Sequence, residues 1–111
     1  MKQVAEITKK DPKLLEMLER LKKHLSPEKI YLFGSRARGE SDADSDYDLL
    51  IVVGYSDLPQ YKRNQQAFSL LRGVGVSKDV IVLTRAEFDK KRGVVSSLPA
   101  TVEREGILLY E

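Results

Sequence analysis

Three aspartates are the residues of this sequence best suited to chemistry. Asp46 and Asp48 form an Asp-x-Asp pair, and Asp79 opens a later apolar stretch. On a strand, residues i and i+2 point to the same face, about 6.5 Å apart along the backbone. Carboxylates held this way repel each other, which raises one pKa unless a cation neutralises them. Magnesium prefers oxygen ligands, and two such ions roughly 3.5 to 4 Å apart can clamp an in-line phosphoryl displacement. The pair therefore predicts a divalent-metal site.

The same residues also have plainer interpretations. Asp46 could be an ordinary loop residue and Asp48 a solvated strand end, because Asp-x-Asp alone is a weak signal. Asp79 could be a polar strand end, and its carboxylate joins the other two only if its strand lies beside theirs.

A turn at Gly34-Ser35 is the second chemical feature. Glycine lets the backbone approach a ligand closely. A helix that begins there would offer unpaired N–H groups, and the Ser35 hydroxyl adds a donor, so the turn predicts a site for a phosphate chain. Arg36 and Arg38 flank the turn and could add charge-assisted contacts. The alternative is an ordinary strand-to-helix turn with surface arginines.

Helices and strands alternate around these residues. Asp11 and Pro12 predict a helix start, and Pro27 lies beyond its end. Further helices are expected at 35–39, 59–72, 84–92 and 97–106, and strands at 29–33, 47–53, 78–83 and 107–110. The expected inward residues are Leu14, Leu15, Met17, Leu18, Leu21 and Leu25 in the first helix, and Tyr61, Ala67, Phe68 and Leu71 in the third. We expect an α/β (α+β) fold with a small mixed sheet of three to four strands, forming a single domain over 1–111.

Composition excludes several classes of protein. There is no cysteine, so disulfides, thiol nucleophiles and cysteine-ligated zinc are excluded. No apolar run approaches the roughly 20 residues of a membrane helix, and the first residues lack the apolar core of a signal peptide. The net charge of +2 and the few aromatic residues argue against direct nucleic-acid binding. The single histidine, His24, has no second ligand nearby and is expected on the surface. We expect a cytoplasmic protein.

The combination is more specific than its parts. GSRARG followed by SDYDLLIVV resembles the nucleotidyltransferase superfamily that includes DNA polymerase β, and more narrowly the minimal nucleotidyltransferase domains of prokaryotes. The resemblance covers about residues 12–111. Many of these domains form toxin–antitoxin modules with HEPN-domain proteins, which are often ribonucleases.

The resemblance implies a polymerase β-like fold and a set of roles. Gly34 and Ser35 would bind the triphosphate of ATP, and Asp46 and Asp48 would coordinate two magnesium ions. Asp79 would be the third carboxylate, acting as a base or second-metal ligand toward the acceptor hydroxyl. Arg36 and Arg38 match basic positions of the motif, without a specific role.

Two functions follow as expectations. The first is transfer of AMP from ATP to a hydroxyl, on a tyrosine of a HEPN-type toxin partner, which would make the protein an antitoxin; a small-molecule acceptor is a variant of this. The second is a catalytically idle antitoxin that neutralises its partner by contact. The chain leaves no residues for a separate acceptor-binding domain, so another chain is expected to complete the site, either a HEPN partner or a second copy.

Overall fold

The computed structural model describes residues 7, 9–42 and 44–111. Four strands form one mixed sheet in the order β3-β2-β1-β4. The strands are β1 (Lys29–Phe33), β2 (Tyr47–Val53), β3 (Lys78–Thr84) and β4 (Ile107–Tyr110). The helices are α2 (Pro12–Leu25), α3 (Ser35–Arg38), α4 (Gln60–Leu70), α5 (Arg85–Lys91) and α6 (Leu98–Glu105). This is the predicted mixed α/β architecture.

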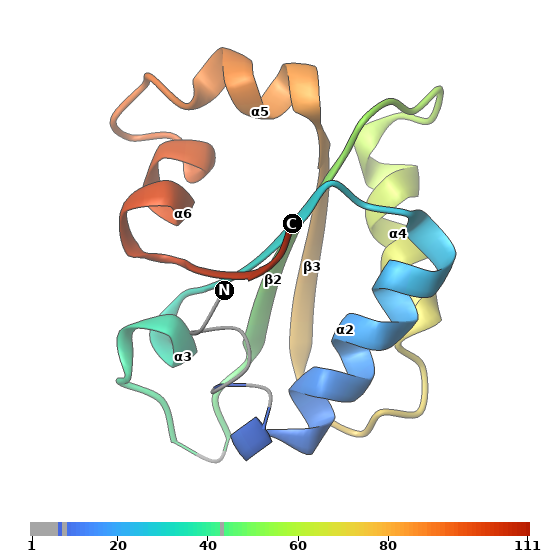
Figure 1. Ribbon diagram of the computed structural model, residues 1–111, viewed down its shortest axis with the longest axis vertical. Helices are drawn as coiled ribbons and strands as arrows, with labels where there is room; N and C mark the ends of the chain where they lie inside the picture. Colours follow the sequence, from blue (N-terminus) through green and yellow to red (C-terminus); the bar gives the residue numbers. More distant parts are fainter. Residues whose placement is uncertain (1–6, 8, 43) are drawn as a thin grey trace.

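The sheet lies between two layers of helices. In Figure 1, α2 and α4 lie on one side of β2 and β3, and α3, α5 and α6 lie on the other. Strands β1 and β2 pair antiparallel, as do β1 and β4, whereas β2 and β3 pair in parallel. The parallel pair is connected through α4, as parallel strands require a crossover. The third strand therefore lies directly beside the second, as the grouping of the aspartates required.

Local sequence explains where the helices begin. The Asp11 carboxylate accepts from the backbone N–H of Leu14 at 3.1 Å, and Pro12 occupies the first turn of α2. Thr84 and Glu87 form a capping box at α5. At α6 the Ser97 side chain accepts a hydrogen bond from the backbone N–H of Ala100. These starts confirm the predicted boundaries to within a residue or two.

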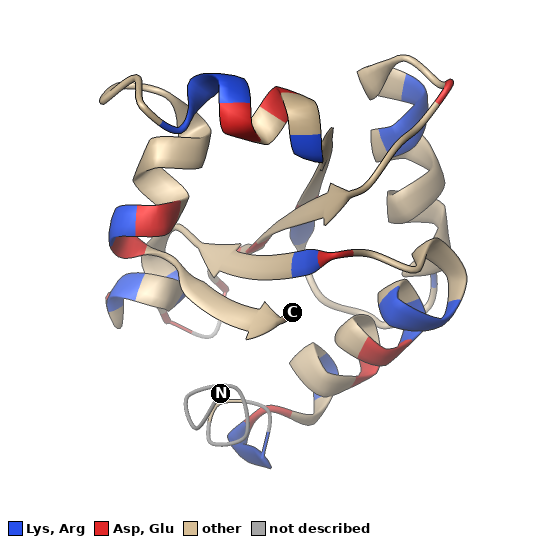
Figure 2. Ribbon diagram, turned by 45° about the horizontal axis from the view of Figure 1, so that its top comes forward, with Lys and Arg blue, Asp and Glu red and all other residues tan. Residues whose placement is uncertain are grey.

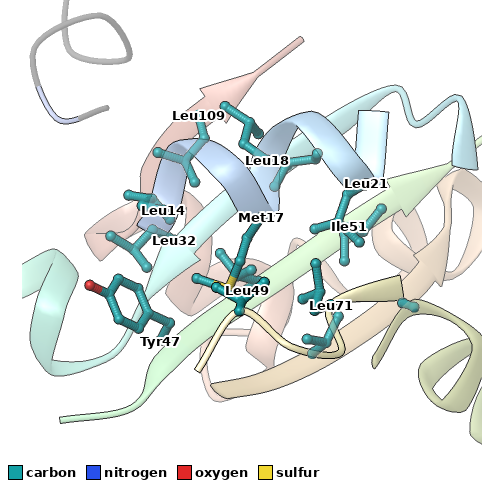
Figure 3. Packing of buried hydrophobic residues seen from close by; sticks show 14 of the residues in the cluster. Leu14, Met17, Leu18, Leu21, Leu32, Tyr47, Leu49, Ile51, Leu71 and Leu109 are labelled. Atoms are coloured by element: carbon teal, nitrogen blue, oxygen red, sulfur yellow. The ribbon is translucent and has the colours of Figure 1, made fainter. Parts of the chain in front are cut away.

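The two faces of the sheet support two separate hydrophobic clusters. Strand residues alternate between faces, and the alternation divides β2: Leu49 and Ile51 join the cluster beneath α2 and α4, whereas Leu50 and Val52 join the one beneath α5 and α6. Figure 3 shows the first of these clusters, in which four residues of α2 (Leu14, Met17, Leu18 and Leu21) pack onto side chains from the sheet. Burial of Leu49 to Val52 on both faces was the expectation from their uninterrupted apolar run.

Three residues predicted to face inward do not. Leu15 is 40% exposed, Tyr61 is 61% exposed and Phe68 is 50% exposed. In α4 the buried residues are Ala67, as predicted, and Arg63, which was not predicted. Arg63 is only 5% exposed, and its guanidinium forms two hydrogen bonds with the carboxylate of Glu87 on α5, at 2.7 and 2.9 Å. Sequence periodicity missed this because an arginine in an inward position is not an apolar signal.

Apart from Arg63, the charged residues that the structure describes are exposed or partly exposed. Figure 2 shows Lys, Arg, Asp and Glu on the helices and at strand ends, with the middles of the strands free of them. His24 is exposed, as expected. Among the described residues, no helix is both long and apolar enough to cross a membrane.

Candidate active site

The three aspartates lie on one face at one end of the sheet. Asp48 and Asp79 are register partners across the parallel pair of β2 and β3, and Asp46 immediately precedes β2. Asp48 has the same strand parity as Leu50 and Val52, and Asp79 the same as Ile81 and Leu83, so both belong to the face covered by α5 and α6. Asp48 and Asp79 therefore share the face that carries the smaller hydrophobic cluster.

The carboxylate of Asp48 is the electrostatic centre of the group. Partial burial raises its pKa, and the negative charges of Asp79 and Asp46 raise it further, while Arg38 opposes the shift. Like charges disfavour ionisation of one another. The contribution of Asp46 to this shift is the repulsion expected within the Asp-x-Asp pair, and a bound cation would relieve it.

Asp46 has a partner that sequence analysis missed. The Ser77 hydroxyl donates to its Oδ1, and the backbone N–H of Tyr47 donates to the Ser77 carbonyl at 2.9 Å. Ser77 thus fixes the loop before β3 against the start of β2. In the described residues, no three or more His, Cys, Asp or Glu side chains are already grouped as a metal site. The donor set still fits magnesium, because it consists of carboxylate oxygens, which this ion prefers as ligands.

Two features of the structure favour glycine at position 34: the backbone conformation of the turn and the closeness of the Asp48 carboxylate. Its φ of +76° lies in a region that side-chain-bearing residues rarely adopt. A Cβ added there would lie 2.2 Å from Oδ2 of Asp48. The backbone of the Gly-Ser turn therefore lies against the central carboxylate, and any larger residue would displace it.

The turn opens into α3, which has only four residues. No side chain caps its first turn. Among the described residues, the Ser35 hydroxyl forms no hydrogen bond. The turn therefore brings the start of α3 beside the Asp48 carboxylate.

Arg36 holds the loop rather than facing the turn. Its Nε and Nη2 donate to the Ser45 carbonyl at 3.1 and 2.8 Å, and its guanidinium lies 3.9 Å from the centre of the Tyr47 ring. These contacts shape the loop that leads into Asp46. Its predicted role in nucleotide binding stays a prediction.

Arg38 is the arginine that acts on the carboxylates. Its Nε donates to Glu40 at 2.7 Å, and its charge lowers the pKa of Asp48. The side chain is 43% exposed, so it can exchange Glu40 for another anion at little cost.

A partly buried hydrogen bond anchors this end of β2 to α2. The Tyr47 hydroxyl donates to Oδ2 of Asp11 at 2.7 Å, while the other oxygen of Asp11 caps the helix. Burial and the Asp11 carboxylate raise the pKa of Tyr47 to about 12. Asp11 was predicted only as a helix cap; its second contact fixes the residue that lies between the two aspartates.

Comparison with known proteins now identifies the family. The profile described as "Nucleotidyltransferase domain" matches residues 13–108, which include the turn and all three aspartates. This chain belongs to the nucleotidyltransferase domain family. The resemblance seen in the sequence is thereby confirmed for the fold and the family.

Individual relatives agree with this. A protein of Methanocaldococcus jannaschii, named provisionally as a protein adenylyltransferase, is 27% identical over 100 residues, or 85% of this chain and 96% of its own length. A crystal structure from Sulfolobus solfataricus, also provisionally named a nucleotidyltransferase, superposes with a TM-score of 0.63 at 26% identity, over 97% of this chain and 86% of that one. A toxin–antitoxin structure with AMP-PNP shares the fold with a TM-score of 0.50 at 21% identity, over 86% and 71% of the two chains.

Proposed function

We propose that this nucleotidyltransferase domain transfers AMP from ATP to a hydroxyl group of a partner protein, and that the partner is a HEPN-type toxin with an acceptor tyrosine. The observation that carries the proposal is the contact of Gly34 with Asp48, beside Asp46 and Asp79. This joins the Gly-Ser turn to a carboxylate whose charge is disfavoured by two neighbouring carboxylates. The name of the M. jannaschii relative supports a protein acceptor, and the toxin–antitoxin neighbour shares the fold.

The residues would divide the work as follows. Asp46 and Asp48, with Asp79, would hold magnesium, which supplies charge neutralisation for the phosphates when bound. Gly34 and Ser35 would bind the phosphate chain, with Arg38 close to the carboxylates and Arg36 positioning the loop. The acceptor oxygen forms a bond to the α-phosphorus, the bond to the bridging oxygen breaks, and pyrophosphate leaves. The hydroxyl proton would pass to Asp79 in the role of base, the alternative role of this carboxylate being ligand to the second magnesium ion.

The test is transfer of label from α-labelled ATP to the co-purified partner, with magnesium. Asp46→Asn and Asp48→Asn each keep the side-chain shape but remove a charge, and we expect at least about a 100-fold loss of transfer. Asp57→Asn is the matched control, since Asp57 is exposed in the loop after β2, where its carboxylate accepts a hydrogen bond from the Tyr55 hydroxyl. Full transfer by both site variants would reject the assignment.

The same variants separate the enzyme from the idle antitoxin. If transfer causes neutralisation, Asp48→Asn should bind the toxin without silencing it. If the variant silences the toxin as well as the unmodified protein does, neutralisation by contact is the correct description. Transfer to a small molecule but to no protein would reassign the acceptor class. The presence or absence of an adjacent HEPN gene tests the identity of the partner.

A further inference from the structure

A groove lies along the outer edge of β3, beneath α4. It has a volume of about 600 Å³, and its lining includes Phe68, Arg72, Lys78, Asp79 and Val80. We name it the α4–β3 groove. It begins at the third carboxylate of the candidate site, so whatever binds along it is placed beside Asp79.

The edge of β3 is blocked along only half of its length. The Asn64 side chain accepts from the backbone N–H of Val82 at 2.8 Å, and the Glu87 side chain accepts from that of Thr84 at 2.9 Å. Alternate residues of a strand direct their backbone groups to the same side. The backbone N–H groups of Val80 and Lys78 therefore also point away from β2, toward the outer edge. In the described residues, no side chain pairs with the Val80 N–H. Edge strands with unpaired groups are templates for an added strand.

The lining of the groove also carries two cations, Arg72 and Lys78, beyond the Asp79 carboxylate at its end. Among the described residues, neither Arg72 nor Lys78 forms an ion pair, whereas most other arginines of α2, α3 and α5 do. The Lys78 ammonium lies 5.2 Å from the centre of the half-exposed Phe68 ring. The groove thus combines an aromatic contact surface with two cations, which favours an acidic segment.

The alternation of β3 gives the position of each residue in such a segment. Lys78 and Val80 face α4, and Asp79 faces the opposite side, toward α5 and α6. A strand added at this edge alternates in the same way. A residue placed opposite Asp79 points to the catalytic face, and its immediate neighbours point to Phe68, Arg72 and Lys78.

We propose that the α4–β3 groove binds the acceptor segment of the partner protein as an added strand, with the hydroxyl-bearing residue directed to Asp79 and acidic residues immediately on either side of it. Transfer of AMP to the hydroxyl rests on the proposed function, whereas binding of the segment in the groove does not. The inference identifies the acceptor chemically: an extended acid–tyrosine–acid segment, rather than a helix or a basic peptide.

The test uses three short synthetic peptides that each carry one tyrosine and a fluorescein label. One has glutamate at the positions adjacent to the tyrosine, one has glutamate two positions away on each side, and one has lysine at the adjacent positions. We measure Kd by fluorescence anisotropy with the full chain, at low salt. The adjacent-glutamate peptide should bind about tenfold more tightly than the other two.

Charge reversal supplies the matched variants. Arg72→Glu with Lys78→Glu should invert the preference, so that the lysine peptide binds best. Lys62→Glu is the control, since Lys62 is exposed on α4 outside the groove and should leave the ranking unchanged. Phe68→Ala should weaken the adjacent-glutamate peptide severalfold, and Tyr61→Ala, on the same helix, should not.

Each outcome decides the inference. Absence of binding, equal affinity for both glutamate peptides, or a ranking unaffected by charge reversal overturns it. Transfer of label to the same peptides is scored separately. Charge-dependent binding without transfer of label supports binding in the α4–β3 groove and rejects the proposed function. Transfer of label without charge-dependent binding supports the proposed function and rejects binding in the groove.

Discussion

The two faces of the sheet differ in what they contribute to the protein. The face beneath α2 and α4 carries the larger cluster, with Leu21, Leu49 and Ile51 at most 1% exposed. The face beneath α5 and α6 carries a smaller cluster, and its open end holds the aspartates. A closely packed face stabilises the strands, so the other face can hold destabilising charges at fixed positions. Matched substitutions on the two faces test this division.

The largest expected effect is on packing. Leu49 and Leu50 are adjacent, fully buried, and point to opposite faces. We expect Leu49→Ala to lower the free energy of unfolding by about 4 kcal/mol, because the cavity lies in a rigid cluster. Leu50→Ala should cost about 3 kcal/mol, because partly exposed neighbours can collapse into the space. Urea denaturation measures both, and a larger cost at Leu50 would contradict the division.

A smaller effect is expected where α4 and α5 meet. Glu87→Gln leaves the buried Arg63 guanidinium without its carboxylate, while glutamine preserves the shape of the capping residue. The Glu87 side chain is 44% exposed, so we expect a loss of about 1–2 kcal/mol rather than the full penalty of a buried pair. Glu103→Gln, which breaks an exposed pair with Arg92, should cost less than about 0.5 kcal/mol.

The same pair predicts a pH dependence. The Arg63 guanidinium lowers the pKa of Glu87 to about 2 from its ordinary 4.5. A lowered pKa means that the stabilisation is fully present above pH 4.5 and is lost as the pH falls toward 2. The difference in stability between the unmodified protein and Glu87→Gln should therefore shrink over that interval. A constant difference from pH 7 to pH 2 would exclude an ionic origin.

At the candidate active site, removal of a charge should raise the stability of the fold, whereas at Glu87 it should lower it. Asp48→Asn removes repulsion from Asp46 and Asp79, so the metal-free protein in EDTA should gain up to about 1 kcal/mol of stability. Magnesium should raise the Tm of the unmodified protein and not that of the variant, because the cation relieves a repulsion that the variant lacks. Destabilisation by Asp48→Asn in EDTA would mean that the carboxylate serves the fold.

The smallest effect is expected at Leu15. It was predicted as a core residue but is 40% exposed. Leu15→Ala should change stability by less than about 0.5 kcal/mol, whereas Leu14→Ala on the same helix should cost several kcal/mol. Equal losses of stability for Leu15→Ala and Leu14→Ala, measured by thermal or urea denaturation, would show that Leu15 is a core residue.

Local signals in the sequence were sufficient for the elements. Asp11-Pro12, the Thr84 capping box and the apolar run of β2 act over a few residues, so each predicted its helix or strand correctly. The Gly-Ser turn and the Asp-x-Asp pair are likewise short-range, and together they were sufficient to identify the family.

Only the tertiary structure decided which residues meet across the fold. The pairing of Asp48 with Asp79 depends on strand order, and the contacts of Asp46 with Ser77 and Tyr47 with Asp11 join segments far apart in the chain. The burial of Arg63 is another such case, because it depends on Glu87 arriving from α5. The sequence by itself determines which residue types are present and how near neighbours along the chain are arranged. Packing alone determines the long-range partner of each side chain, since that partner is selected by the whole arrangement of layers.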